Sequence, residues 1–162
     1  MAWDVLGHEW AEQMLSEHIR SGQVRQAYLF TGPSGVGRRT LALRLVQAIF
    51  CASPAAPGVP CRTCQPCLQV ERMQHPDLFP VAAEQEGGEL RIDAIRELQR
   101  SLALSPYTAS RKVALLMRFE EANQNAQNAL LKTLEDTPSH TILLLTASSA
   151  ETVLPTIASR CE

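Results

Sequence analysis

The sequence is organised around one glycine-rich segment, Thr31-Gly32-Pro33-Ser34-Gly35-Val36-Gly37-Arg38-Arg39-Thr40. An apolar run at 27–30 precedes it and is typical of a buried strand, whereas the run at 41–50 that follows is typical of a helix. A glycine loop between a strand and a helix predicts a phosphate-binding loop, because backbone N–H groups and the helix N-terminus attract anions.

The segment departs from that pattern at two decisive positions. After the last glycine the pattern requires Lys, which reaches the β- and γ-phosphates, and then Ser or Thr, which holds Mg²⁺. Arg38 and Arg39 occupy these positions, and Thr40 comes one residue late, about 100° further round the helix. The segment therefore predicts a degenerate phosphate loop that binds neither ATP nor Mg²⁺, although a phosphate or sulfate ion stays possible. Its defining residues are Gly32, Gly35, Gly37, Arg38 and Arg39.

Composition and charge narrow the class of protein. The 162 residues are 45% apolar and 20% charged, with a formal net charge of −2. This balance is typical of a globular domain and argues against a strongly basic surface for nucleic acid. Because no long apolar run or leader sequence is recognised, a cytoplasmic location without membrane contact is expected.

Apolar runs and helix-periodic segments alternate along the chain. Helices are expected over residues 7–21, 41–50, 65–74, 91–104 and 126–135, and strands over 27–30, 78–81, 113–117 and 141–146. The run at 113–117 is apolar throughout, which is typical of a strand covered on both faces, and the strand at 141–146 is expected to be buried as well. The alternation predicts an α/β fold with a largely parallel sheet.

Four of the five cysteines cluster in a short Pro- and Gly-rich stretch, at Cys51, Cys61, Cys64 and Cys67. Their spacing of ten, three and three residues brings four thiolates to one point, which satisfies a closed, structural Zn²⁺ site. Free thiols, disulfides and an iron–sulfur cluster remain alternatives. Cys161 is remote in sequence, and His75 is expected to end a helix before Pro76 rather than to bind metal.

The second half of a nucleotide site is also changed. A phosphate-loop ATPase needs a carboxylate at the end of a neighbouring strand to hold Mg²⁺. The strand at 113–117 ends instead in Met117-Arg118. Glu120 and Glu121 come too late for that role, and a solvated loop edge is expected for both.

These motifs together resemble a known family. They are the stretch 27–33, the four-cysteine insert, the stretch 128–135 and Ser159-Arg160-Cys161. The combination resembles the bacterial clamp-loader AAA+ subunits, which are the gamma/tau and delta-prime subunits of DNA polymerase III. Gamma and tau keep an intact Lys-Thr loop and an Asp-Glu pair, so the chain is most similar to the delta-prime branch. His75-Pro76-Asp77 and residues 92–96 are also similar to that branch.

The resemblance implies the architecture of the whole chain. Residues 1–162 are expected to form a three-layer P-loop NTPase domain of the AAA+/RecA-like type, with a parallel sheet flanked by helices. A small zinc-binding insert, with the four cysteines as ligands, is expected at about 51–67. The lid and collar domains of the family are expected to lie outside this chain.

The resemblance also implies a role in DNA replication. The chain is expected to be an ATPase-inactive subunit of the DNA polymerase III holoenzyme, a rigid stator without catalysis of its own. In the family, the arginine of the Ser-Arg-Cys motif acts as a finger in a neighbour's ATP site, which makes Arg160 the expected finger. Thr146 lies where the family senses the γ-phosphate, but a strand-end cap is expected here. The implied partners are the gamma/tau and delta subunits, with the sliding clamp and primed DNA reached through the assembled complex.

Two other functions remain open from the residues themselves. An active ATPase of the gamma/tau type would need Arg38 to replace the lysine and Glu120 to replace the metal carboxylate. A zinc-dependent nucleic-acid binder would use the insert as a finger, but only Arg62 and Arg72 supply charge there.

Overall fold

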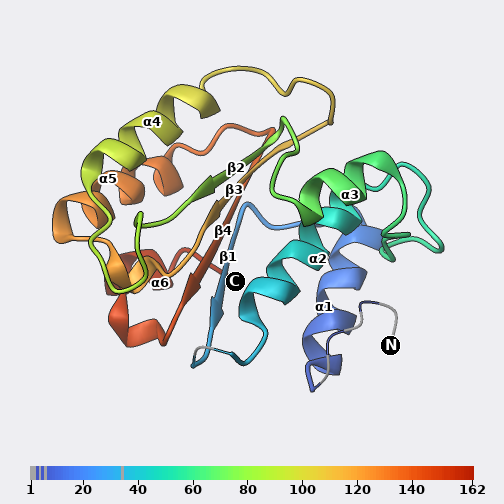
Figure 1. The fold of residues 1–162 in the computed structure, drawn as a ribbon, viewed down its shortest axis with the longest axis horizontal. Helices are drawn as coiled ribbons and strands as arrows, with labels where there is room; N and C mark the ends of the chain where they lie inside the picture. Colours follow the sequence, from blue (N-terminus) through green and yellow to red (C-terminus); the bar gives the residue numbers. More distant parts are fainter. Residues whose placement is uncertain (1–2, 4, 6, 34) are drawn as a thin grey trace. The chain divides into compact units, whose positions relative to one another are not determined.

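The computed structural model describes residues 3, 5, 7–33 and 35–162, which form two compact units (Figure 1). One unit comprises residues 26–36 and 76–162, and the other comprises residues 1–25 and 37–75. Ser34 of the glycine segment lies outside the described residues. None of the helices in the described part of the chain has the length and apolar character needed to cross a membrane.

The first unit is built on a four-stranded parallel sheet with the order β1-β4-β3-β2. The strands are β1 Ala27–Thr31, β2 Leu78–Val81, β3 Lys112–Leu116 and β4 Thr141–Ala147. Every residue of β3 and β4 is buried, as their continuous apolar runs predict. Pro80 is tolerated because β2 is an edge strand of this sheet.

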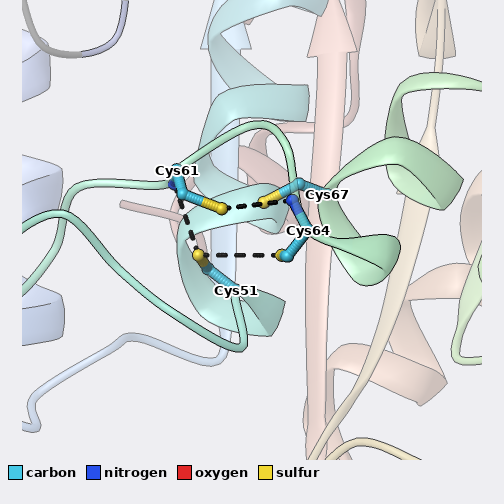
Figure 2. A group of neighbouring side chains, drawn as sticks. All are labelled: Cys51, Cys61, Cys64 and Cys67. Carbon is cyan, nitrogen blue, oxygen red and sulfur yellow. Dashed lines mark hydrogen bonds between the residues drawn. The ribbon is translucent and has the colours of Figure 1, made fainter.

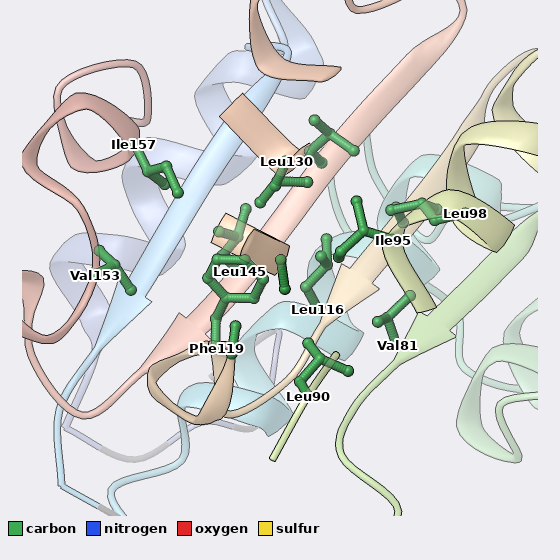
Figure 3. Close-up of a cluster of buried hydrophobic side chains, with 14 of the residues drawn as sticks. Val81, Leu90, Ile95, Leu98, Leu116, Phe119, Leu130, Leu145, Val153 and Ile157 are labelled. Atoms are coloured by element: carbon green, nitrogen blue, oxygen red, sulfur yellow. The ribbon is translucent and has the colours of Figure 1, made fainter. Parts of the chain in front are cut away.

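Three helices of this unit pack on one face of the sheet: α4 Ile92–Leu102, α5 Gln124–Glu135 and α6 Pro155–Ala158. Their apolar side chains form a buried cluster with alternate residues of the strands (Figure 3). Ile95 and Leu98 of α4 enter this cluster, as the three- and four-residue spacing predicts. The short helix α6 and the two 3-10 turns, Phe119–Glu121 and Ala150–Thr152, were not predicted.

Helix α5 begins earlier than its apolar residues suggest. The side chain of Asn123 accepts a hydrogen bond from the backbone N–H of Ala126 at 2.9 Å. This is a side-chain N-cap, which satisfies one of the free donors of the first turn. The helix therefore starts at Gln124, two residues before the predicted start.

The second unit contains the helices α1 Glu9–Arg20, α2 Arg38–Phe50 and α3 Gln65–Glu71. Helix α2 contacts both α1 and α3. It starts at Arg38, three residues before the predicted start, so both arginines of the glycine segment lie in its first turn. The cysteine-rich insert connects α2 to α3. The predicted class, α/β with a parallel sheet, is confirmed.

Candidate functional site

Four cysteine thiols converge in the unit that holds α1, α2 and α3 (Figure 2). The sulfur atoms of Cys51, Cys61, Cys64 and Cys67 all lie within 4.8 Å of one another. Those of Cys51 and Cys64 are 3.9 Å apart. Thiolates bound at about 2.3 Å around tetrahedral Zn²⁺ are separated by about 3.8 Å, so this donor set fits zinc.

The local backbone directs N–H groups at the sulfurs. Arg62 adopts a left-handed conformation with φ of 64°, and the N–H groups of Thr63 and Cys64 then donate to Cys61 Sγ at 3.4 and 3.3 Å. The N–H of Cys61 donates to Cys51 Sγ at 3.3 Å. Such donors stabilise the negative charge that four thiolates share.

The thiols differ in acidity. Hydrogen bonds from the backbone and hydroxyl of Thr63, and then from the N–H of Cys64, lower the pKa of Cys61 to about 5. Burial raises the pKa of Cys67 well above its usual range, and burial also raises that of Cys51. Cys61 therefore loses its proton more easily than Cys67. Metal binding at the cluster would release the Cys67 proton.

Neither of the other sulfur or imidazole candidates joins this cluster. The converging ligand atoms in the described part of the chain come from cysteines alone. The ring of His75 stacks on Phe50, with centroids 4.3 Å apart. Cys161 belongs to the sheet unit, where burial raises its pKa to about 11.

The glycine segment is described in two parts, one in each unit. In the sheet unit, the N–H of Gly32 donates to Ala147 O at 3.2 Å, and the N–H of Val36 donates to Pro33 O at 3.2 Å. Gly32 has a φ of 150°, and a Cβ there would lie 2.8 Å from Val36 Cγ1. This close approach explains the glycine.

In the other unit, Gly37 is the N-cap of α2 and adopts a left-handed conformation with φ of 96°. Arg38 and Arg39 follow in the first turn, which contains no acidic residue. Cations are disfavoured at this end of a helix, because the helix dipole is positive there. The two arginines therefore occupy positions that helix stability alone would not select.

Strand β3 is followed by Met117 and Arg118, where a phosphate-loop ATPase carries its pair of carboxylates. Arg118 adopts a left-handed conformation with φ of 51°. Its N–H donates to Thr146 Oγ1 at 3.0 Å, and its Nη2 donates to Ala83 O at 3.1 Å. Thr146 thus serves the end of the neighbouring strand, as expected from the sequence.

The expectation of a solvated loop edge at Glu120 and Glu121 is wrong for Glu121. Only 12% of the Glu121 side chain is exposed. Its carboxylate accepts hydrogen bonds from Arg118 Nε at 3.2 Å and from the N–H of Gly87 at 2.8 Å. Glu120 is partly buried and accepts the N–H of Ser148 at 3.2 Å. Both acids thus face partners within the chain because the turn after β3 folds back on the sheet unit.

Arg160 lies just beyond α6 and pairs with the last residue of α5. Its Nη2 is 3.4 Å from Glu135 Oε1, and the two side chains are 47% and 48% exposed. The chain is anchored directly after it, because Glu162 exchanges two backbone hydrogen bonds with Ala27 and Leu29, each of 3.0 Å. The guanidinium is therefore accessible on a fixed backbone.

Sequence reasoning missed two buried residues beside the cysteine cluster. Arg44 and Gln47 lie within the otherwise apolar part of α2 that follows Thr40, and both are buried. The only signal in the sequence was two polar residues, three apart, inside an apolar run.

Comparison with known proteins identifies the family. The family model described as DNA polymerase III, delta subunit, matches residues 7–162. The delta′ subunit of Pseudomonas aeruginosa DNA polymerase III is 37% identical over 154 residues, which are 95% of this chain and 47% of that protein. The tau subunit of Escherichia coli is 30% identical over 158 residues, which are 98% of this chain and 24% of that protein. The chain thus spans less than half the length of these relatives.

Solved structures show the same fold. A DNA polymerase III gamma subunit-related protein of Thermotoga maritima superposes with a TM-score of 0.67 and 25% identity, over 95% of this chain and 43% of that one. The RuvB Holliday junction branch migration motor of the same organism gives a TM-score of 0.59 at 15% identity, over 95% of this chain and 43% of that one. The fold is that of an AAA+/RecA-like P-loop domain, and the chain belongs to the DNA polymerase III delta-subunit family.

Proposed function

We propose that this chain is the AAA+ domain of a clamp-loader subunit of the delta-prime type, and that it does not hydrolyse ATP. The observation that carries the proposal is the end of β3. Met117 and Arg118 are there in place of the pair of carboxylates that hold Mg²⁺ and activate water, and the guanidinium of Arg118 is held by Glu121 and Ala83. Mg²⁺ bound at this strand end would meet a fixed positive charge rather than an oxygen ligand.

The glycine segment supports the same proposal. Arg38 stands where the phosphate-binding lysine belongs, and Arg39 replaces the hydroxyl that holds Mg²⁺. A guanidinium is a broad, planar group and does not substitute for a compact ammonium. The changes at β3 and at the start of α2 are independent. Each removes one of the two groups of side chains with which a phosphate-loop ATPase binds magnesium triphosphate.

Arg160 would then act on a nucleotide bound by a neighbouring subunit. Its guanidinium is half exposed, carries a permanent charge and is matched in shape to phosphate oxygens. A finger supplied in trans stabilises charge that develops during phosphoryl transfer. Glu135 holds the guanidinium within the isolated chain, and a nucleotide phosphate would replace this carboxylate in the complex.

The partners follow from the same proposal. The chain would assemble with gamma/tau and delta subunits in the cytoplasm as a rigid stator, and would reach the sliding clamp and primed DNA through that assembly. Residues 1–162 would form one AAA+ domain with its metal-binding insert at about 51–67. The lid and collar of the family would belong to other parts of the full-length protein.

The four cysteines would hold a structural zinc ion. When bound, zinc supplies four bonds that close the insert, and the tetrathiolate set leaves no open position for catalysis. The insert between Cys51 and Cys67 contains few apolar residues. Metal binding would therefore provide much of the free energy that orders it.

The test has two measurements. Isothermal titration of the purified chain with ATP–Mg²⁺ should give no binding below millimolar concentration. In the complex assembled from full-length subunits, Arg160→Ala should lower ATP hydrolysis by the neighbour by about 10³-fold or more, as for other arginine fingers. Arg96→Ala is the matched control, because Arg96 is also exposed and also pairs with an acid, Asp93.

Two results would contradict the proposal. Submicromolar binding of ATP–Mg²⁺, with turnover that is lost in Arg38→Ala, would identify an active ATPase instead. Equal hydrolysis by complexes with Arg160→Ala and Arg96→Ala would remove the finger role and leave the stator role to be judged by assembly alone.

A further inference from the structure

Helix α2 buries a charged and a polar side chain that face the cysteine cluster and the N-terminal segment. Arg44 and Gln47 are 6% and 1% exposed. Arg44 Nη1 donates to Gln47 Oε1 at 2.9 Å and to Glu71 Oε2 at 3.1 Å. Its Nε donates to the backbone carbonyl of Trp3 at 3.1 Å. One guanidinium therefore joins α2, α3 and the start of the chain.

The network continues to a cysteine of the cluster. Gln47 Nε2 donates to the carbonyl oxygen of Cys67 at 3.0 Å. The Cys67 sulfur lies 3.9 Å from the backbone carbonyl oxygen of Gln47. Cys67 is the one fully buried member of the cluster. A continuous line of hydrogen bonds thus runs from Trp3 through Arg44 and Gln47 to Cys67.

A second connection returns from the insert to Trp3. The indole N–H of Trp3 donates to Gly58 O at 3.0 Å, and Ser16 Oγ donates to the same oxygen at 3.3 Å. Gly58 has a φ of 80°, and a Cβ there would lie 2.8 Å from Ser16 O. The insert is therefore seated tightly on α1, and Trp3 is held by the insert at its indole and by Arg44 of α2 at its carbonyl.

Little else orders these segments. Helix α3 has seven residues, which is too short to be stable alone. The loop from residue 51 to residue 64 contains only one isolated bridge, between Ala56 and Val59. Trp3 is fully buried, although it lies near the start of the chain. Its indole N–H bonds to Gly58 of the insert, and its carbonyl bonds to Arg44 of α2, which in turn bonds to Glu71 of α3.

We propose that metal occupancy of the cysteine cluster controls whether the N-terminal segment is docked, through the line Cys67, Gln47, Arg44 and Trp3. This inference rests on the proposed zinc site. Loss of metal frees α3 and the insert, which takes the partner Glu71 from Arg44 and the partner Cys67 from Gln47 while both side chains stay buried. The unit relieves that cost by releasing Trp3.

The same segment passes the start of α2. A Cβ at Gly37 would lie 3.7 Å from His8 Nε2 and 3.9 Å from Val5 Cγ1. The docked segment therefore packs beside the residue that caps the helix. Metal loss would loosen the beginning of α2, where Arg38 and Arg39 lie.

Tryptophan fluorescence tests the proposal directly. The chain has two tryptophans, and Trp10 is 70% exposed whereas Trp3 is buried. In Trp10→Phe, Trp3 is the sole reporter. Removing zinc with a chelator should shift its emission to the red and raise acrylamide quenching severalfold, and adding zinc should reverse both changes. Metal content is measured on the same samples.

Hydrogen exchange distinguishes the release of Trp3 from the unfolding of the whole chain. Amides of β3 and β4 should stay protected when Trp3 is released, because those strands belong to the other unit. Loss of their protection together with Trp3 burial would overturn the proposal. Unchanged Trp3 emission after complete metal removal would also overturn it. A chain that never binds zinc would contradict the metal site itself, and metal analysis separates that result from the others.

If zinc binding favours the docking of Trp3 through this line of hydrogen bonds, then breaking the line must also weaken zinc binding. Gln47→Leu should lower the affinity of the cluster for zinc, measured by competition with a chelator, about 10- to 100-fold, which is the range for groups that support a metal ligand. Gln99→Leu is the matched control, because Gln99 makes two comparable hydrogen bonds in the other unit, to Ala129 and Thr133. Equal zinc affinities of the two variants would overturn the proposal.

Discussion

The backbone N–H of Arg118 donates to the hydroxyl of Thr146 at 3.0 Å, joining the ends of β3 and β4. Thr146 is buried, and Arg118 adopts a left-handed conformation that points its N–H at this hydroxyl. In an ATPase these two strand ends face the nucleotide and its metal ion. In this chain the end of β3 instead forms a hydrogen bond with the end of β4.

Thr146→Val therefore removes the acceptor of a buried N–H. The free energy of unfolding should fall by about 1–3 kcal/mol, because the Arg118 N–H loses its partner without reaching water. Urea denaturation measures this change. Thr156→Val, at an exposed position of α6, should change stability by less than about 0.5 kcal/mol. Similar losses in both variants would show that the Thr146 hydroxyl contributes little.

Glu121 and Glu120 are neighbours in sequence with different degrees of burial. Glu121 holds Arg118 and the N–H of Gly87 with a nearly buried carboxylate. Glu121→Ala should destabilise the chain by about 1–3 kcal/mol, because it removes two hydrogen bonds to a charged carboxylate. Glu120→Ala should cost less, since the hydrogen bond from Ser148 to Glu120 is exposed. Hydrogen exchange at residues 84–90 should rise in the Glu121 variant alone.

Asp77 organises the loop between α4 and β3. Its carboxylate accepts the N–H groups of Tyr107, Thr108 and Ala109 at 2.5, 2.8 and 2.7 Å. Burial alone would raise the pKa of Asp77, but these hydrogen bonds outweigh it and lower the pKa below 3.8. The loop carries Tyr107, whose side chain is almost fully exposed. The Asp77 carboxylate, rather than apolar packing of Tyr107, therefore holds this part of the loop in place.

This shift predicts how stability depends on pH. A folded-state pKa below the unfolded value gives a contribution that is complete above the unfolded value and is lost as pH falls through the folded pKa. The difference in unfolding free energy between the wild type and Asp77→Asn should be constant from about pH 7 to pH 5 and should shrink below about pH 4. Asp93→Asn, at an exposed carboxylate, is the control. A difference independent of pH down to about pH 2 would contradict the prediction.

The cysteine cluster predicts the metal content of variants. The wild type should carry one zinc per chain, and Cys61→Ser should lose most of it, because a hydroxyl is a poor zinc ligand beside three thiolates. Cys161→Ser should keep the metal, since Cys161 belongs to the other unit. Elemental analysis after gel filtration makes the comparison. Retention of zinc by Cys61→Ser at wild-type level would exclude Cys61 as a ligand.

The sequence alone predicted the features that depend on the periodicity or the spacing of residues. The continuous apolar runs of β3 and β4, the helical spacing of Ile95 and Leu98, and the cysteine spacing each specify a local structure with few alternatives. The convergence of Cys61, Cys64 and Cys67 follows from two overlapping short steps, whereas Cys51 is brought to them by the return of a longer loop.

Contacts between distant segments were beyond such reasoning. Glu121 is buried because Gly87 and Arg118 meet there, and neither neighbour is marked by any local pattern. The three N–H groups that Asp77 accepts lie about 30 residues away from it. Polar groups of this kind are placed by tertiary packing, so composition and period give no signal for them.

Arg160 and Glu135 allow a finger role to be separated from a structural one. Their ion pair is 3.4 Å long and half exposed, and exposed pairs contribute about 0–1 kcal/mol. Arg160→Ala should therefore lower the free energy of unfolding by less than about 1 kcal/mol, and Glu135→Gln should give a similarly small change. Both are measured by urea denaturation of the chain. Because neither variant unfolds, a loss of the neighbour's ATP hydrolysis in Arg160→Ala would come from the missing guanidinium. Glu135→Gln keeps that guanidinium and should keep the hydrolysis. If the two variants instead lowered hydrolysis equally, the ion pair itself, and not a finger, would be what the neighbour requires.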